Sequence, residues 1–553
     1  MDHRGTQRLE TERLILRRFA LNDAPAMFRN WASDGEVTKY LTWPTHQSVE
    51  TTQWVLDSWV PHYGENNYYH WAITLKENGD EPIGDIAAVR LDEDAACAEI
   101  GYCLGRQWWH CGIMPEALKA VTDFLFNTVG ADRVEAKHDV MNPNSGRVML
   151  KCGMRYEGTL RASHRNNRGI CDVNCYSLLK SERQLAAPDE NGNKTFFDRF
   201  VSCTAAGSGS QNWFGAADPG QVVTCRVYYK LSRDTDECAL LYSNLIDSTY
   251  ADGSHSHANF MPGPWTVHSL KAGRVSACGM EEAAAPERFM QVTFGGRAEK
   301  RVGPGELFSC DPFRFPARRG EYMCVEMAFS GAKVPCHTES LLPAFRFADG
   351  SWTHSTEIPF PCMVAAKRKN ETRLGFIGDS ITQGIGTPDN SYTHVAARVQ
   401  EALGEGVAVW DLGLGYGRGH DAALDGSWLY RARQNDVMCV CFGVNDLFQL
   451  GDAELLKKDL AYIVRALKQA GLKVLLQTVP PFDYAPEFRE RWLSVNDHIK
   501  TELAKEADAV FDCVPVLSRG SDTPWLSRYG AHPDAEGNAA WAEALLPTLK
   551  KLL

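Results

Sequence analysis

Residues 375–386 read GFIGDSITQGIG, an apolar run that ends in Gly378, Asp379 and Ser380. Glycine, aspartate and serine are common wherever a chain turns. A serine in the same place, at the end of a buried strand, also suits a nucleophile. The residues that follow along the chain have to decide between these two interpretations.

Downstream of this stretch, apolar runs alternate regularly with helical patterns. The apolar runs lie at 373–378, 407–413, 436–443, 473–479 and 509–516. Continuous apolar strands separated by helices are typical of a parallel sheet that is covered on both faces. The pattern predicts a flavodoxin-like, three-layer α/β domain over residues 371–553.

Polar residues follow several of these predicted strands, where such sheets bind their ligands. Ser380 follows the first strand, the glycine-rich segment 411–419 the second and Asn445 the third, whereas His532 precedes the last helix. Hydrolysis of an acyl ester needs these groups. Ser380 would attack the carbonyl carbon and His532 would accept its proton. The oxyanion would be stabilised by the Ser380 amide, by the Asn445 side chain and by a glycine amide of the segment, that of Gly415 or Gly417.

Together, the blocks GDS, DLGLGYGRG, GVND and YGAHPDAEG resemble the SGNH/GDSL serine esterases. The resemblance covers roughly 371–553 and implies Ser380 as nucleophile and His532 as base. The family has an aspartate three residues before its histidine, where this chain has Tyr529. His532 would then work as a dyad with Ser380, oriented by a backbone carbonyl or by another acid such as Asp522. Asp534 is expected to be the N-cap of the last helix. We expect Asp379 and Asp446 to have structural rather than catalytic roles.

The first part of the chain has a different, mixed α/β pattern. ETERLILRRFALNDAPAMF (10–28), EIGYCLGRQWWHCGIMPEALKAVTDFLF (99–126) and NPNSGRVMLKCGMRYEG (142–158) resemble the GNAT acyl-CoA acyltransferases. Within that family they are most similar to the ribosomal-protein N-acetyltransferase branch. The resemblance spans residues 8–180.

The resemblance implies acetyl-CoA as co-substrate and assigns residues to it. The pyrophosphate loop would run from Gln107 through Trp109 to Gly112, with His110 where the family has a glycine. Asn144, followed by Ser145, would lie near the pantetheine, and Glu99 is a candidate general base. Exposed amides at a helix N-terminus suit a phosphate.

The middle of the chain carries short strand patterns separated by Gly, Pro, Asp and Ser. A polar linker is expected at 181–195, followed by an all-β sandwich or jelly-roll domain at 196–365. Such a sandwich precedes the hydrolase domain in some GDSL esterases. Trp213, Tyr242 and Trp265 could be platforms for a sugar, although packing in the core is the favoured role for each.

Composition limits the partners. The chain of 553 residues has a net charge of −12, which argues against a nucleic-acid or anionic-membrane partner. No apolar run is long enough for a membrane span. The 17 cysteines include no CxxC pair, so we expect no metal site. The absence of an export signal predicts a cytoplasmic location.

The sequence therefore predicts a serine esterase fused to an acetyl-CoA-dependent N-acetyltransferase. The ester would carry a short acyl group, such as an O-acetyl group on a carbohydrate or small metabolite. Two alternatives remain. One is an amine acetyltransferase with an impaired hydrolase domain, and the other is a glycan-binding protein whose two catalytic ends are degenerate.

Overall fold

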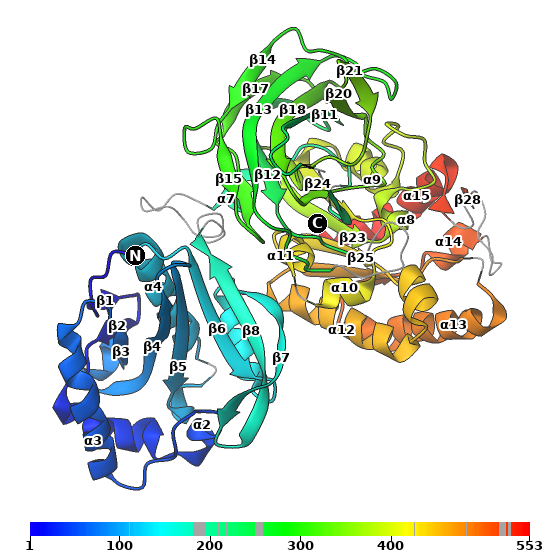
Figure 1. The fold of residues 1–553 in the computed structure, drawn as a ribbon. Coiled ribbons are helices and arrows are strands. Elements are labelled where there is room, and N and C mark those ends of the chain that lie inside the picture. Colours follow the sequence, from blue (N-terminus) through cyan, green and yellow to red (C-terminus); the bar gives the residue numbers. More distant parts are fainter. Residues whose placement is uncertain are drawn as a thin grey trace. The chain divides into compact units, whose positions relative to one another are not determined.

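A computed structural model shows the fold (Figure 1). It describes residues 1–109, 111–180, 195–207, 209–215, 218–248, 258–424, 426–482, 484–518 and 532–553, and the backbone of 527–528. His110, Asp522, Tyr529 and linker residues 181–194, all named above, lie outside these ranges. The chain forms two compact units, residues 1–186 and 187–553, and each is considered by itself.

The first unit is built on one eight-stranded sheet in the order β1-β2-β3-β4-β5-β6-β8-β7. Its strands are β1 (Leu9–Glu10), β2 (Leu14–Arg17), β3 (His70–Leu75), β4 (Pro82–Asp92), β5 (Cys97–Leu104), β6 (Arg133–Asp139), β7 (Arg155–Asn166) and β8 (Gly169–Leu179). Its helices are α1 (Ala24–Met27), α2 (Gly35–Thr38), α3 (Val49–Trp59), α4 (Ile113–Phe124) and α5 (Pro143–Lys151).

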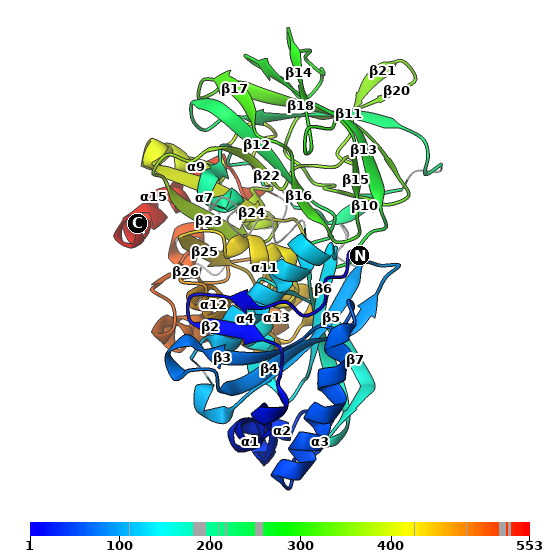
Figure 2. The ribbon, with the colours of Figure 1, turned by 90° about the vertical axis from the view of Figure 1, so that its left-hand side faces the viewer.

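Apolar side chains on alternate residues of the central strands pack against helices on opposite faces of this sheet (Figure 2). Trp71 and Ile73 of β3 join the core beneath α4, whereas Ala72 joins the core beneath α1 and α3. Helix α4 continues through a wide turn to Gly130, whose φ of +82° ends it.

The strands β5 and β6 are parallel but pair over only three residues, ending at Glu99 opposite Glu135. Beyond that point they diverge. Residues 100–104 of β5 and the end of β6 then line a cavity of about 1020 Å³ instead of bonding to each other. This gap in the sheet gives side chains from both of its faces access to one space.

The second unit begins with a β-sandwich. Its larger sheet contains β11 (Val223–Lys230), β13 (Trp265–Val275), β14 (Phe289–Val292), β15 (Lys300–Val302), β18 (Tyr322–Gly331), β20 (Ala344–Ala348) and β21 (Ser351–His354). The smaller contains β9 (Phe200–Ser202), β12 (Thr235–Ser243), β16 (Leu307–Ser309), β17 (Phe313–Ala317) and β22 (Met363–Lys367). A short pair joins β10 (Asn212–Phe214) to β19 (Val334–Cys336). Trp265 and Tyr242 are buried in this core, so packing is their role.

The rest of the second unit is a five-stranded parallel sheet in the order β24-β23-β25-β26-β27. The strands are β23 (Thr372–Gly378), β24 (Val407–Gly413), β25 (Val437–Cys441), β26 (Lys473–Gln477) and β27 (Ala509–Phe511). The helices are α8 (Ser380–Gln383), α9 (Val395–Leu403), α10 (Gly419–Ala423), α11 (Ser427–Ala432), α12 (Ala453–Gln469), α13 (Pro486–Thr501), α14 (Val514–Ser518) and α15 (Ala535–Leu552).

This strand order is the flavodoxin-like one that the sequence predicted. The connections leave β23 toward β24 on one side and return to β25 on the other, which opens a crevice at the carboxyl ends of these strands. Ser380 follows β23 and Asn445 follows β25, so the topology brings both residues to that crevice.

Candidate active sites

Ser380 and His532 meet at the carboxyl edge of the parallel sheet. Ser380 is the first residue of α8, and His532 lies in β29 (His532–Pro533), directly before α15. The Ser380 Oγ and the His532 Nε2 are 2.8 Å apart, which is hydrogen-bond distance. Gly386, at the end of the opening motif, has a φ of +102°, and a Cβ there would lie 2.9 Å from the His532 Cβ. The glycine therefore lets the histidine segment approach α8.

Two aspartates near this pair cap helices. The Asp379 Oδ1 accepts from the Ile381 amide (2.9 Å) at the start of α8, and Asp534 accepts from two amides at the start of α15. These are the cap positions that favour aspartate. Burial raises the pKa of Asp379 to about 7, with the nearby charge of Asp446 adding to the shift.

The GVND segment holds the glycine-rich segment in place. Asn445 Nδ2 donates to the Gly417 carbonyl (3.0 Å), and Asp446 accepts from the amides of Gly419 (2.9 Å) and His420 (3.0 Å). A carboxamide nitrogen carries two hydrogens. The bond to Gly417 uses one of the two on Asn445. Burial raises the pKa of Asp446 to about 6, while its two amide partners act against that rise.

Both candidate oxyanion glycines already donate their amides. The Gly415 amide donates to the Gln383 Oε1 of α8 (2.5 Å), and the Gly417 amide donates to the Leu414 carbonyl within the segment (2.9 Å). Tyr416 between them has a φ of +56°, an uncommon conformation for a residue with a side chain. Neither glycine amide is therefore free in this conformation.

The sandwich contributes residues that the motifs did not reveal. Gln211 donates to the Gly415 carbonyl (2.8 Å), and Gln383 Nε2 donates to the Glu339 carbonyl (2.7 Å). Gln211 Nε2 also contacts the Glu339 carboxylate (3.2 Å), and burial raises the pKa of that carboxyl. Because these residues are far from the glycine segment in sequence, no local signal could have linked them to it.

Aromatic side chains flank His532. The Phe482 ring meets the His532 ring edge-on with centroids 6.3 Å apart, and it packs against Phe448 and Tyr484. Phe448 is 40% exposed, so one side of this group faces solvent. These rings form an apolar surface next to His532.

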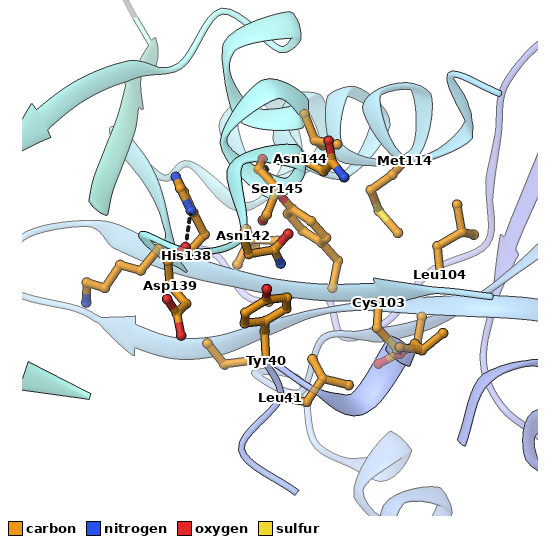
Figure 3. A pocket seen from close by; sticks show the side chains of 18 of the residues that line it. Tyr40, Leu41, Cys103, Leu104, Met114, His138, Asp139, Asn142, Asn144 and Ser145 are labelled. Carbon is orange, nitrogen blue, oxygen red and sulfur yellow. Dashed lines mark hydrogen bonds between the residues drawn. The ribbon is translucent and has the colours of Figure 1, made fainter. Parts of the chain in front are cut away.

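The first unit has its own candidate site in the cavity between β5 and β6. Figure 3 shows Asn144, Ser145 and Met114 on one side of the strands and Tyr40 and Leu41 on the other. The Tyr102 hydroxyl lies 3.0 Å from the Ser145 Oγ, which links β5 to the start of α5.

Three comparisons with known proteins identify these two regions. Residues 13–155 match the family model described as acetyltransferase (GNAT) domain, and residues 376–540 match the GDSL-like lipase/acylhydrolase family. The uncharacterized N-acetyltransferase p20 of Bacillus licheniformis is 34% identical over 174 residues, which are 32% of this chain and 97% of that protein. The chain belongs to the GNAT family.

Two further comparisons fall on the same part of the chain. The ribosomal-protein-serine acetyltransferase of Escherichia coli K12 is 33% identical over 140 residues, 25% of this chain and 76% of that protein. A solved structure of an acetyltransferase from T. thermophilus is 29% identical, covering 32% of this chain and 91% of that one, with a TM-score of 0.29. The chain is thus an enzyme with a GNAT acyltransferase domain and a GDSL-like acylhydrolase domain, as its motifs predicted.

Of the four residues expected to hold acetyl-CoA, three line the GNAT cavity and one does not. Gly112, at the N-terminus of α4 with a φ of +75°, and Asn144 both line it. Trp109 also lines it, but its indole N–H donates to the Leu104 carbonyl (2.8 Å). Gln107 is exposed, and it is not among the residues that line the cavity.

The cavity suits the chemistry of a coenzyme A thioester. The N-terminus of α4 meets it at Gly112, and Arg147 and Lys151 of α5 also line it, so helix amides and two cations are available to phosphates. Ile113 and Met114 supply apolar surface for a pantetheine chain. When bound, such a thioester would supply the acyl group that is transferred.

The candidate base Glu99 lies at the point where β5 and β6 separate and lines the cavity. Its carboxylate is 2.8 Å from the Lys137 Nζ and 3.2 Å from the Arg90 Nε. Two cations therefore engage the carboxylate that would have to accept a proton.

Among the residues that the structure describes, no helix is long and apolar enough to cross a membrane.

Proposed function

We propose that the acylhydrolase domain is a serine esterase that acts through Ser380 and His532. The 2.8 Å contact between Ser380 Oγ and His532 Nε2 carries this proposal. His532 would accept the serine proton as Ser380 attacks the carbonyl carbon, and would return it to the leaving alcohol. Water would then release the acid by the same route.

The oxyanion would be held by the Ser380 amide and by Asn445. We favour Asn445 because only one of its two N–H donors is used by Gly417. Each well-placed donor is worth roughly 3 kcal/mol in the transition state. Gly415 or Gly417 would add a third donor only after giving up its present hydrogen bond, to Gln383 or to Leu414.

For the substrate, we propose a short acyl ester, such as an O-acetyl group on a carbohydrate or small metabolite. The half-exposed aromatic group around Phe482 supports this, since aromatic faces stack on sugar rings. The Glu339 carboxylate of the sandwich lies next to the buried Gln211 side chain that bonds to Gly415, and a polar group there suits a hydroxyl-rich molecule. The cytoplasmic location stays a prediction.

The test is release of p-nitrophenol from acetyl, butyryl and octanoyl esters. We expect Ser380→Ala and His532→Ala to lower kcat by at least about 10³-fold. Ser391→Ala is the matched control, because this half-buried serine hydrogen-bonds through its side chain to Thr393, away from Ser380 and His532 in the described hydrogen bonds. Equal turnover by the native chain and Ser380→Ala would refute the esterase. It would favour the alternative of a chain that is chiefly an amine acetyltransferase.

We infer that the GNAT domain transfers an acetyl group from acetyl-CoA to an amine. The cavity, with cations and helix amides among its lining residues, supports this function. Calorimetry with acetyl-CoA tests it directly. We expect saturable binding that weakens when Arg147 and Lys151 are both changed to Ala, and no heat of binding to the intact chain would refute it.

A further inference from the structure

A buried polar cluster lies on the sheet face beneath α1 and α3. Asp85 of β4 pairs in register with Ala72 of β3 and Cys103 of β5, so all three residues lie side by side across the sheet. His70, two residues before Ala72, lies on the same face. His70, Asp85 and Cys103 all line the cavity of the GNAT domain.

The hydrogen bonds fix where the protons are in this cluster. His70 Nε2 is 2.9 Å from the Asp85 Oδ2, and the Cys103 thiol donates to the Asp85 Oδ1 (2.7 Å). A carboxylate only accepts, so Nε2 carries a hydrogen and Nδ1 of the neutral ring keeps its lone pair. The Tyr68 hydroxyl, 3.2 Å from Nδ1, donates to that lone pair.

Two groups next to His70, the Cys103 thiol and the Tyr68 hydroxyl, keep their protons at neutral pH. Burial raises the pKa of the Cys103 thiol well above its ordinary value and that of Tyr68 to about 12, so both stay protonated. Tyr63 faces the backbone instead, since its hydroxyl donates to the His70 carbonyl (2.9 Å). The exposed His62 packs against the Tyr68 ring with centroids 5.3 Å apart.

The cluster lies at the aromatic part of the cavity. Trp43, Trp59 and Tyr68 line it and pack with the core beneath α1 and α3. The Trp59 and His70 ring centroids are 4.2 Å apart. The cations Arg147 and Lys151 instead come from α5. A thioester with its phosphates near α4 and α5 would leave this aromatic part to the acyl acceptor.

We propose that Tyr68, His70 and Asp85 form a proton relay for an acceptor amine carried on an aromatic body. This inference rests on the proposed acetyl transfer and names its acceptor class and base. The amine nitrogen would bond to the acyl carbon, and the carbon–sulfur bond would break. The amine would give a proton to the Tyr68 oxygen while Tyr68 gives its own to His70 Nδ1. Asp85 stabilises the resulting imidazolium, and the proton finally balances the departing thiolate through solvent.

The experiment uses the full chain, acetyl-CoA and 2-phenylethylamine, with thiol release as the readout and ethylamine for comparison. We expect kcat/KM for 2-phenylethylamine to exceed that for ethylamine by at least about tenfold. His70→Gln and Tyr68→Phe should lower kcat by roughly 10²-fold or more, with the Kd for acetyl-CoA changed less than about twofold. His354→Gln is the matched control, since His354 is exposed in β21 of the second unit and does not line the cavity.

The kcat and KM values separate a base from a merely structural histidine. Removal of a base lowers kcat while the KM for the amine and the melting temperature stay close to native, whereas removal of a structural histidine also lowers the melting temperature and raises KM. A His70→Gln variant that keeps the native kcat would overturn the relay. The relay would also be overturned if Glu99→Gln lost activity while His70→Gln kept it. Acetyl-CoA binding without turnover of 2-phenylethylamine would overturn the acceptor class, whereas no acetyl-CoA binding would refute the proposed transfer itself.

Discussion

Replacing Gly413 by alanine should disable the esterase site without touching a reacting group. Gly413 ends β24, and a Cβ there would lie 2.3 Å from the Gln383 amide nitrogen and 2.7 Å from the Thr382 carbonyl carbon. Both are backbone atoms of α8. Since ordinary contacts begin near 3.4 Å, α8 or β24 must move by roughly 1 Å. Overpacking of this kind costs about 1–3 kcal/mol of stability.

That movement acts on Ser380, because α8 begins with this residue. A shift of about 1 Å would stretch the 2.8 Å contact between Ser380 Oγ and His532 Nε2 beyond hydrogen-bond distance. Misplacement by about 1 Å can cost about 10²-fold in rate, which corresponds to about 2.7 kcal/mol in the barrier. We therefore expect kcat/KM for p-nitrophenyl acetate to fall about 100-fold in Gly413→Ala.

The assay needs a control for the added methyl group. Gly406, just before β24, has no atom within 4 Å of where its Cβ would be, so Gly406→Ala should keep native turnover. Both variants are compared at a temperature where circular dichroism shows them folded. Native kcat/KM in a folded Gly413→Ala chain would show that the close approach of β24 to α8 does not position Ser380.

Three further predictions concern buried and paired charges. Burial raises the pKa of Asp379 to about 7, so folding keeps this carboxyl protonated while the unfolded chain ionises it near pH 4. The native chain should therefore lose on the order of 4 kcal/mol of stability as pH rises from about 4 to 7, whereas Asp379→Asn, which cannot ionise, should not show this loss in thermal melts. Arg431 is fully buried and lies 2.7 Å from the Asp247 carboxylate. Asp247→Ala removes this ion pair and should lower the stability of the second unit by about 3–5 kcal/mol, measured by thermal melts. The hydrogen bond from Asp459 raises the pKa of His420, so this pair stabilises the folded chain only while His420 is protonated. Asp459→Asn should therefore lower the stability by under about 1 kcal/mol below pH 6.5 and leave it unchanged well above the raised pKa. Thermal melts at pH 5.5 and 9 measure the difference.

The sequence predicted the parallel sheet and its polar edge because both follow from local pattern. Apolar runs of strand length fix β23 and β24, and the residue after a parallel strand must lie at the ligand-binding edge. Ser380 and His532 could therefore be paired from order alone. The role of Asp534 as an N-cap was also predictable, since it stands immediately before the helical pattern of α15.

The relay of the GNAT domain could not be predicted in that way. Placing His70 against Asp85 and Cys103 requires the register between β3, β4 and β5, including the irregularity near Ile73 that shifts the pairing. A shift of one residue would turn Asp85 to the opposite face. Side chains that meet across strands depend on pairing that no single segment encodes, and so this cluster has no motif.

The change in composition between residues 365 and 371 invites cutting the chain there, but the contacts argue otherwise. Arg233 of the sandwich is buried, forms a 2.6 Å ion pair with Glu371 and donates to the Val407 carbonyl (2.7 Å) at the start of β24. A charge buried this deeply is tolerable only with its partners. Gln211 likewise reaches the carbonyl of Gly415. Expressing 371–553 alone would remove the groups that hold the glycine segment beside Ser380, which is a physical reason for a sandwich to precede this hydrolase.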